Sequence, residues 1–108
     1  MSGNVMQLTD ASFASEVLQS GIPVVVDFYA DWCGPCKKVG PVIAELAGEY
    51  DGKVKVCKMD VDTNTERAAE FGIRSIPTVK IFKGGAEVDS KTGFASIDVY
   101  RTMIDKQL

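Results

Sequence analysis

Apolar and polar positions alternate along the chain in blocks whose period changes from one block to the next. The run Val24–Ala30 is almost continuously apolar, which is typical of a strand covered on both faces. From Cys33 onward, apolar residues recur at spacings of four and three, the period of a helix. These residues are Val39, Ile43, Leu46 and Tyr50. The pattern therefore predicts a buried strand that passes directly into an amphipathic helix.

The remaining blocks predict further strands and helices. Strands are expected at residues 5–7, 54–61, 78–82 and 87–92, with Gly84-Gly85 favouring a hairpin between the last two. The three other predicted helices are one capped by Thr9 or Asp10, one over 64–71 with a capping box at Thr63 and Glu66, and one that begins after Ser96. The order βαβαβαββα indicates an α/β fold, in which a mixed sheet carries helices on both faces.

The bulk composition is that of an ordinary globular domain. Hydrophobic residues make up 45% and charged residues 25% of the 108-residue chain, and the net charge of −3 argues against a nucleic-acid partner. No stretch approaches the roughly 20 apolar residues of a membrane span. The N-terminus shows no secretory signal pattern. We expect one domain over residues 1–108, located in the cytoplasm, with no membrane partner.

Two of the three cysteines, Cys33 and Cys36, lie where the buried strand passes into the long helix. Residues three apart at the start of a helix share a face, so a small adjustment brings their sulfurs within disulfide reach. We predict that Cys33 is exposed, and that unsatisfied N–H groups at the helix start stabilise its thiolate. We predict that Cys36, one turn further in, is shielded. Cys33 would then attack a disulfide, and Cys36 would resolve the product.

A zinc site and a purely structural disulfide are the competing interpretations of this pair. A structural zinc site needs about four ligands, and the chain has no histidine and only one further cysteine, Cys57. A disulfide that closes so short a loop restricts the unfolded chain little. We therefore favour a redox dithiol in a reducing compartment, with no metal. Cys57 lies in a predicted buried strand and is expected to be an inert thiol.

Asp27 interrupts the apolar run. Aspartate is depleted in strands, and burying its ionised carboxylate is costly. One explanation is an edge position open to solvent. The other is a buried acid with a raised pKa beneath the cysteine-bearing helix, able to exchange a proton with Cys36.

Two segments of the chain resemble a known family. Residues 24–37 read Val-Val-Val-Asp-Phe-Tyr-Ala-Asp-Trp-Cys-Gly-Pro-Cys-Lys, and residues 71–78 read Phe-Gly-Ile-Arg-Ser-Ile-Pro-Thr. They are similar to the active-site signature of the thioredoxin family and to the loop that faces it, and the element order agrees over essentially the whole chain. The resemblance implies the thioredoxin fold, a central five-stranded mixed β-sheet flanked by four α-helices, with Val24–Ala30 at its centre.

The resemblance also implies an activity. It implies a monomeric protein disulfide reductase that works through a Cys33–Cys36 redox disulfide and needs no cofactor, because the electrons travel on the cysteines. Its implied partners are thioredoxin reductase and disulfide-containing proteins. Gly34 and Pro35 between the cysteines are typical of reducing members, whereas oxidising and isomerising relatives usually carry a histidine there.

The same resemblance implies further site residues. It pairs Asp27 with Lys58, whose alkyl stem can be buried while its ammonium approaches the carboxylate. It makes Pro77 a cis proline, although an arbitrary X–Pro bond is cis only about 5–6% of the time. The Ile76 backbone would then pair with an extended substrate segment. The implied docking rim comprises Trp32, Val61, Ile76 and Gly93, each of which could instead be ordinary packing.

Phe94, next to Gly93, departs from the family pattern, which commonly has a small residue there. This departure leaves the preference for partners open. Two other functions also remain open. An oxidase or isomerase on the same fold would have a reduction potential well above the cytosolic glutathione poise. A binding module with an incidental dithiol would keep its partner after both cysteines were replaced by serine.

Overall fold

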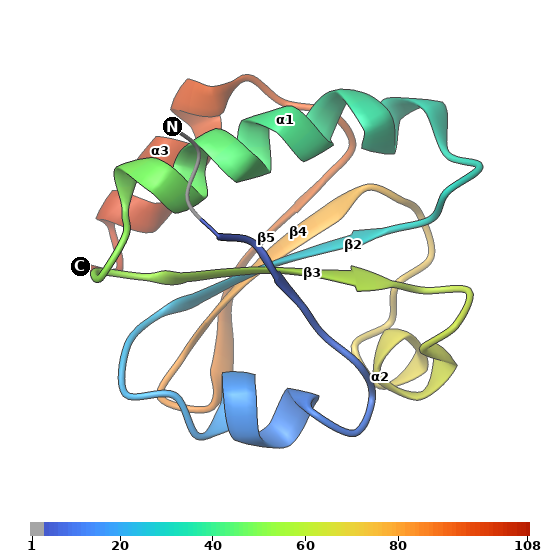
Figure 1. Ribbon diagram of the computed structural model, residues 1–108, viewed down its shortest axis with the longest axis horizontal. Helices are drawn as coiled ribbons and strands as arrows, with labels where there is room; N and C mark the ends of the chain where they lie inside the picture. Colours follow the sequence, from blue (N-terminus) through green and yellow to red (C-terminus); the bar gives the residue numbers. More distant parts are fainter. Residues whose placement is uncertain (1–3) are drawn as a thin grey trace.

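The chain folds into alternating strands and helices, described for residues 4–108 by a computed structural model (Figure 1). The elements are β1 (Met6–Gln7), η1 (Ala14–Leu18), β2 (Val24–Tyr29), α1 (Gly34–Glu49), β3 (Lys55–Asp60), α2 (Thr65–Glu70), β4 (Thr78–Lys83), β5 (Ala86–Thr92) and α3 (Ile97–Asp105). This is the order that the sequence predicts, with η1 a short π-helical segment. No helix within the described residues is long and apolar enough to cross a membrane.

The strands form one mixed sheet in the order β1-β3-β2-β4-β5. The central strand β2 is parallel to β3 and antiparallel to β4, so neighbours on both sides pair with its backbone. Helices cover both faces, and residues Val24–Phe28 are accordingly all buried. The predicted fold class and the central place of this strand are confirmed.

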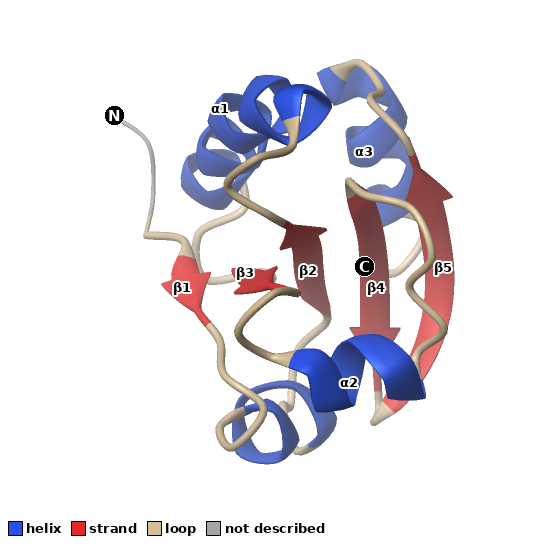
Figure 2. Ribbon diagram, turned by 90° about the vertical axis from the view of Figure 1, so that its right-hand side faces the viewer, coloured by secondary structure: helices blue, strands red, loops and turns tan. Residues whose placement is uncertain are grey.

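The helices form two layers, with α1 and α3 on one face of the sheet and η1 and α2 on the other (Figures 1 and 2). Side chains alternate along β2, so Val25 packs in the core under α1 and α3, whereas Val24 and Val26 pack in the opposite core. Asp27 shares the face of Val25. It therefore lies beneath α1, as predicted.

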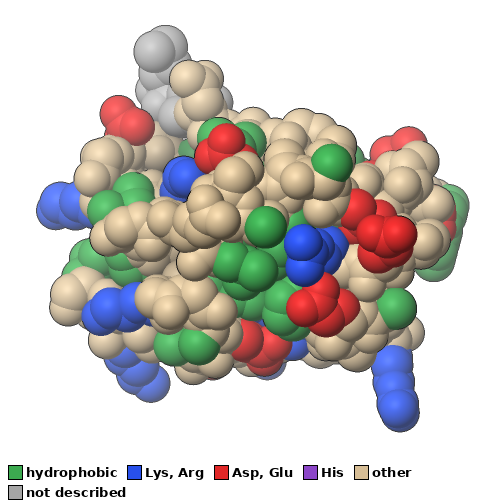
Figure 3. All heavy atoms as spheres, turned by 90° about the horizontal axis from the view of Figure 1, so that it is seen from below, with side chains coloured by type: hydrophobic (Ala, Val, Ile, Leu, Met, Phe, Trp, Pro, Cys, Tyr) green, Lys and Arg blue, Asp and Glu red, His purple; other side chains and the backbone are tan. Residues whose placement is uncertain are grey.

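The face formed by η1 and α2 carries hydrophobic side chains flanked by charged ones (Figure 3). The half-buried apolar residues that pack over this core are Leu18, Val61, Phe71 and Ile73. Arg67 lies over the ring of Phe13, 5.1 Å from its centre, and pairs with Glu70 at 2.8 Å. Charged groups thus border these half-buried apolar residues.

The predicted capping box of α2 is wrong. The helix begins after Asn64, which makes no side-chain cap bond, and Thr63 does not bond to the helix backbone. Instead the two carboxylate oxygens of Asp10 accept the backbone N–H groups of Glu66 at 3.2 Å and Arg67 at 3.0 Å. A residue from a distant loop therefore satisfies the donors that the local motif was expected to satisfy.

The other two caps also differ in detail from the sequence signals. Ahead of η1, Thr9 rather than Asp10 acts locally, because its Oγ1 accepts the N–H of Ser12 at 3.1 Å. Ser96 stands at the N-cap position of α3 as predicted, but its side chain makes no cap hydrogen bond.

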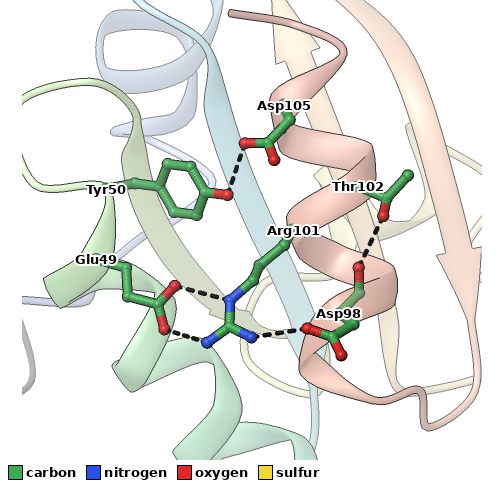
Figure 4. Close-up of polar contacts among 6 residues, drawn as sticks. All are labelled: Glu49, Tyr50, Asp98, Arg101, Thr102 and Asp105. Atoms are coloured by element: carbon green, nitrogen blue, oxygen red, sulfur yellow. Dashed lines mark hydrogen bonds and ion pairs between the residues drawn. The ribbon is translucent and has the colours of Figure 1, made fainter.

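Polar contacts join the carboxyl end of α1 to α3 (Figure 4). Arg101 donates from Nε and Nη2 to the two carboxylate oxygens of Glu49, at 2.8 and 2.6 Å, and from Nη1 to Asp98 at 2.8 Å. The Tyr50 hydroxyl donates to Asp105 at 2.7 Å. These contacts hold α1 and α3 together at the end of α1 that lies away from the cysteines.

Candidate active site

The connection from β2 to α1 carries the cysteine pair, at the end of the sheet that faces the viewer in Figure 2. Cys33 is the N-cap of α1, and Pro35 stands in its first turn, where a missing N–H loses no intrahelical bond. Cys33 and Cys36 form a disulfide, with their Cα atoms 5.3 Å apart. The backbone N–H of Cys36 donates to Cys33 Sγ at 3.2 Å. The positive end of the helix therefore points at the Cys33 sulfur.

Burial does not distinguish the two cysteines. Cys33 is 4% exposed and Cys36 is 5% exposed, so the prediction of an exposed Cys33 beside a shielded Cys36 is wrong for the disulfide form. The surroundings of the two residues do differ. Cys33 Sγ lies 3.8 Å from the carbonyl oxygen of Ile76, in the facing loop, whereas Cys36 lines a cleft beneath α1.

That cleft has a volume of about 210 Å³. Its lining residues are Asp27, Tyr29, Ala30, Asp31, Cys36, Lys37, Gly40 and Lys58. Several water molecules would fit in it, because one water occupies about 30 Å³ in the liquid. Asp27 and Cys36 therefore border the same small space, which is large enough to hold water between them.

Asp27 is 3% exposed, and within residues 4–108 its Oδ1 has no hydrogen-bond partner. Burial raises the pKa of this carboxyl group to about 7, although the positive charge of Lys58 lowers it in part. The explanation of Asp27 as an edge residue open to solvent is thus wrong. The side chain is a buried acid whose charge state changes near neutral pH.

Lys58 lies directly opposite Asp27 in the pairing of β2 with β3, and both residues line the cleft. No ion pair joins the two side chains within the described part of the chain. The Lys58 ammonium instead lies 5.9 Å from the centre of the Tyr29 ring. Lys58 therefore acts on the pKa of Asp27 through its positive charge at a distance, and not through a direct contact.

Two loops meet next to the disulfide. The Ile76–Pro77 peptide bond is cis, and the Pro77 carbonyl accepts the N–H of Gly93 at 2.8 Å. Gly93 has a φ of 87°, which side chains disfavour, so glycine suits this turn. The apolar cluster around the disulfide consists of Ala30, Cys33 and Cys36, with Tyr29, Val61 and Ile76 packed against it.

Trp32 is 71% exposed, and a hydrogen bond orients its indole. Its Nε1 donates to Asp62 Oδ2 at 2.7 Å, and the backbone N–H of Asp62 donates to Asp60 Oδ1 at 2.9 Å. Sequence reasoning missed both aspartates. The signal available in the sequence was Asp60, because an aspartate in a turn commonly accepts the backbone N–H of the residue two positions later.

Cys57 lies apart from this site. It is fully buried on the η1/α2 face of the sheet, whereas Asp27 lies on the other face. Burial raises the pKa of the Cys57 thiol to about 12. These surroundings agree with the expected inert thiol.

The fold and the site define an α/β protein with a redox-capable cysteine pair at the start of the helix that follows the central strand. The family model for thioredoxin matches residues 4–106. The chain is 49% identical over 102 residues to Thioredoxin 1 of Nostoc sp., a match that covers 94% of this chain and 95% of that protein. It is 48% identical over 108 residues to the thioredoxin of Rickettsia conorii, with 100% of both chains covered.

The chain belongs to the thioredoxin family. It is a thiol–disulfide oxidoreductase that reduces protein disulfides, and its cysteine pair forms the redox disulfide expected from the sequence. Membership also implies two general kinds of partner, disulfide-containing substrates and a reductase.

Proposed function

We propose that this chain acts as a monomeric, single-domain electron donor to disulfides of cytoplasmic proteins, with Cys33 as the nucleophile and Cys36 as the resolving thiol. The observation that carries this assignment is the position of Cys33 Sγ. It accepts a backbone N–H at the start of α1 and lies 3.8 Å from the Ile76 carbonyl oxygen, toward the facing loop. Such a position at the helix start stabilises a thiolate and places it beside the Ile76 backbone, where we propose that the substrate segment binds.

In the first step, the Cys33 thiolate attacks one sulfur of a substrate disulfide. The substrate S–S bond breaks, its other sulfur leaves as a thiolate that takes up a proton, and a mixed disulfide joins Cys33 to the substrate. Ile76 contributes its backbone N–H and C=O to an extended substrate segment. Trp32, Val61 and Gly93 supply the surrounding docking rim.

In the second step, Cys36 attacks Cys33 Sγ and releases the second substrate thiolate. The substrate gains two electrons, and the protein is left with the Cys33–Cys36 disulfide. Cys36 must first lose its proton. Asp27 accepts this proton, because it lines the same cleft as Cys36. An acid with a pKa of about 7 can accept a proton at neutral pH and return it later. Lys58 keeps that pKa from rising further.

A thioredoxin reductase then returns two electrons and restores the dithiol. The proposed cycle needs neither metal nor bound cofactor, because the cysteines themselves carry the electrons between partners. Gly34 and Pro35 contribute by keeping the two cysteines one turn apart at the helix start. The cytoplasm fits the proposal because it supplies reducing partners for such a dithiol.

The test is reduction of insulin disulfides by the pure protein with dithiothreitol as the electron source, followed by precipitation of the insulin chains. The matched control is the variant in which both cysteines are serine. We expect rapid precipitation with the wild type and only the dithiothreitol background with the control. Equal rates would contradict the proposal. Retention of a partner by the double-serine variant would instead favour the binding-module alternative.

A further inference from the structure

A second groove lies on the other side of the cysteine pair from the Asp27 cleft. It has a volume of about 390 Å³, and the residues that line it are Gly34, Pro35, Lys38 and Phe94. Gly34 and Pro35 are the residues between the two cysteines. The groove therefore adjoins the cysteine pair at which a substrate reacts.

The groove is apolar with one charged residue at its border. Phe94 is 54% exposed, so about half of this aromatic side chain is open to solvent. Together with the Pro35 ring, Phe94 forms an apolar surface. Covering this surface with an apolar group of a substrate would stabilise the complex. Lys38, on the first turns of α1, adds a positive charge.

The opposite flank of the site carries a carboxylate next to Trp32. Asp62 follows β3, on one side of the central strand β2, and holds the Trp32 indole. Phe94 follows β5, on the other side of β2. A substrate segment that crosses the disulfide thus meets a carboxylate at one end and an ammonium beside an aromatic ring at the other.

We propose that the Phe94–Lys38 groove selects substrates, and that its occupant is a large apolar side chain followed by a carboxylate, within a few residues of the substrate cysteine. This inference rests on the proposed function, because the groove acts only on disulfides that Cys33 attacks. The apolar side chain enters between Phe94 and Pro35, and the carboxylate pairs with Lys38. The Asp62 carboxylate repels the same substrate carboxylate in the reverse orientation.

The experiment uses four peptides, each with one cysteine in a mixed disulfide with glutathione. Beside the cysteine they carry Phe-Glu, Ala-Glu, Phe-Lys or Ala-Lys. For the wild type we expect kcat/KM to favour Phe over Ala by about tenfold, as for filling an apolar pocket, and Glu over Lys by about threefold, as for a solvent-exposed ion pair. The ratio between two peptides cancels any general change in the reactivity of Cys33.

Two variants separate the parts of the groove. Phe94→Ala should abolish the preference for Phe and keep that for Glu, whereas Lys38→Gln should do the reverse. The matched controls are Val99→Ala, at an exposed apolar residue of α3, and Lys53→Gln, beyond the far end of α1; both should keep the wild-type ratios.

Equal kcat/KM for all four peptides with the wild type would overturn the inference, as would Phe94→Ala with unchanged ratios. Hydroxyethyl disulfide, a small neutral substrate without side chains, separates this failure from failure of the proposed function. If the wild type reduces it but shows no preference among the peptides, only the groove proposal is wrong. If the wild type reduces neither hydroxyethyl disulfide nor the peptides, the reductase assignment is wrong, and the groove proposal is wrong with it.

Discussion

The polar groups at the two ends of helix α1 differ in whether they have hydrogen-bond partners. At its carboxyl end, Glu49 and Tyr50 bond to Arg101 and Asp105 of α3, so each of these charges and hydroxyls has a partner (Figure 4). At its amino end, the helix covers Asp27, whose Oδ1 is buried without a partner in the described residues. The polar side chains at the carboxyl end are thus hydrogen-bonded. The amino end covers a carboxyl group that lacks such a partner and lies next to the reactive cysteine pair.

The difference shows where stability and chemistry lie in this protein. A satisfied contact contributes modestly to stability and leaves its groups unreactive. A buried carboxyl group without a partner destabilises the fold once it is ionised, but its pKa of about 7 suits proton transfer at neutral pH. The contacts at the carboxyl end join α1 to α3, whereas the amino end places Cys36 beside Asp27 at one cleft.

The largest expected effect comes from the cysteines. Cys33→Ser should abolish disulfide reduction, whereas Cys36→Ser should still attack a substrate and then remain linked to it, because only the second step is lost. Mass spectrometry of each variant after incubation with oxidised insulin measures the mixed disulfide. A stable adduct on Cys33→Ser through Cys36, and none on Cys36→Ser, would reverse our assignment of the two roles.

Asp27→Asn should have the next largest effect. The pKa of about 7 that Asp27 has in the folded protein lies above the ordinary aspartate value of 3.8. The wild type therefore loses stability as the pH rises above about 4, and the loss levels off above about 7. At about 1.4 kcal/mol per pKa unit, the free energy of unfolding of the variant relative to the wild type should increase by about 2–3 kcal/mol between pH 5 and 8.

Urea unfolding at several pH values measures this difference, and comparing pH values cancels any constant cost of the buried amide. The variant should also resolve mixed disulfides at least about tenfold more slowly in single-turnover experiments, because it lacks the proton acceptor. A stability difference that is flat across this pH range would mean that Asp27 does not titrate with a raised pKa.

Tyr50→Phe probes the carboxyl end of α1 and should affect stability alone. The variant loses the hydrogen bond to Asp105, and the free energy of unfolding should fall by about 1 kcal/mol. Asp105 is exposed, so water can replace the lost donor. Insulin reduction should stay at the wild-type rate. A drop in that rate, at temperatures where the variant is fully folded, would show that the two ends of α1 are not independent.

Lys58→Met should have the smallest effect. Removing the positive charge that lowers the pKa of Asp27 should raise that pKa further above 7. The pH at which the loss of stability levels off should then move upward, and at pH 8 the variant should be less stable by under about 1 kcal/mol, the range for an exposed charge. Lys53→Met is the matched control. Identical pH profiles for the two variants would remove Lys58 from the site.

The part of the site that could be predicted lies within short stretches of sequence. The Cys33–Cys36 spacing, the helix that follows it and the apolar run around Asp27 are local patterns, and the structure has each of them where expected. The prediction that Cys33 is exposed failed because the exposure of a helix start depends on the loops packed against it. Here Ile76 and Val61 cover the disulfide from two other connections.

The sequence alone determined the order of strands and helices, since hydrophobic period and turn residues are read within a few positions. It also determined which residues could do thiol chemistry. Tertiary structure alone decided which groups meet. Asp10 caps α2 across 56 and 57 positions of sequence, Asp62 orients Trp32 across 30, and Cys36 shares a cleft with Asp27 and Lys58. Such contacts bring together residues far apart in the chain, and no local period encodes them because packing of the two helical layers on the sheet creates them.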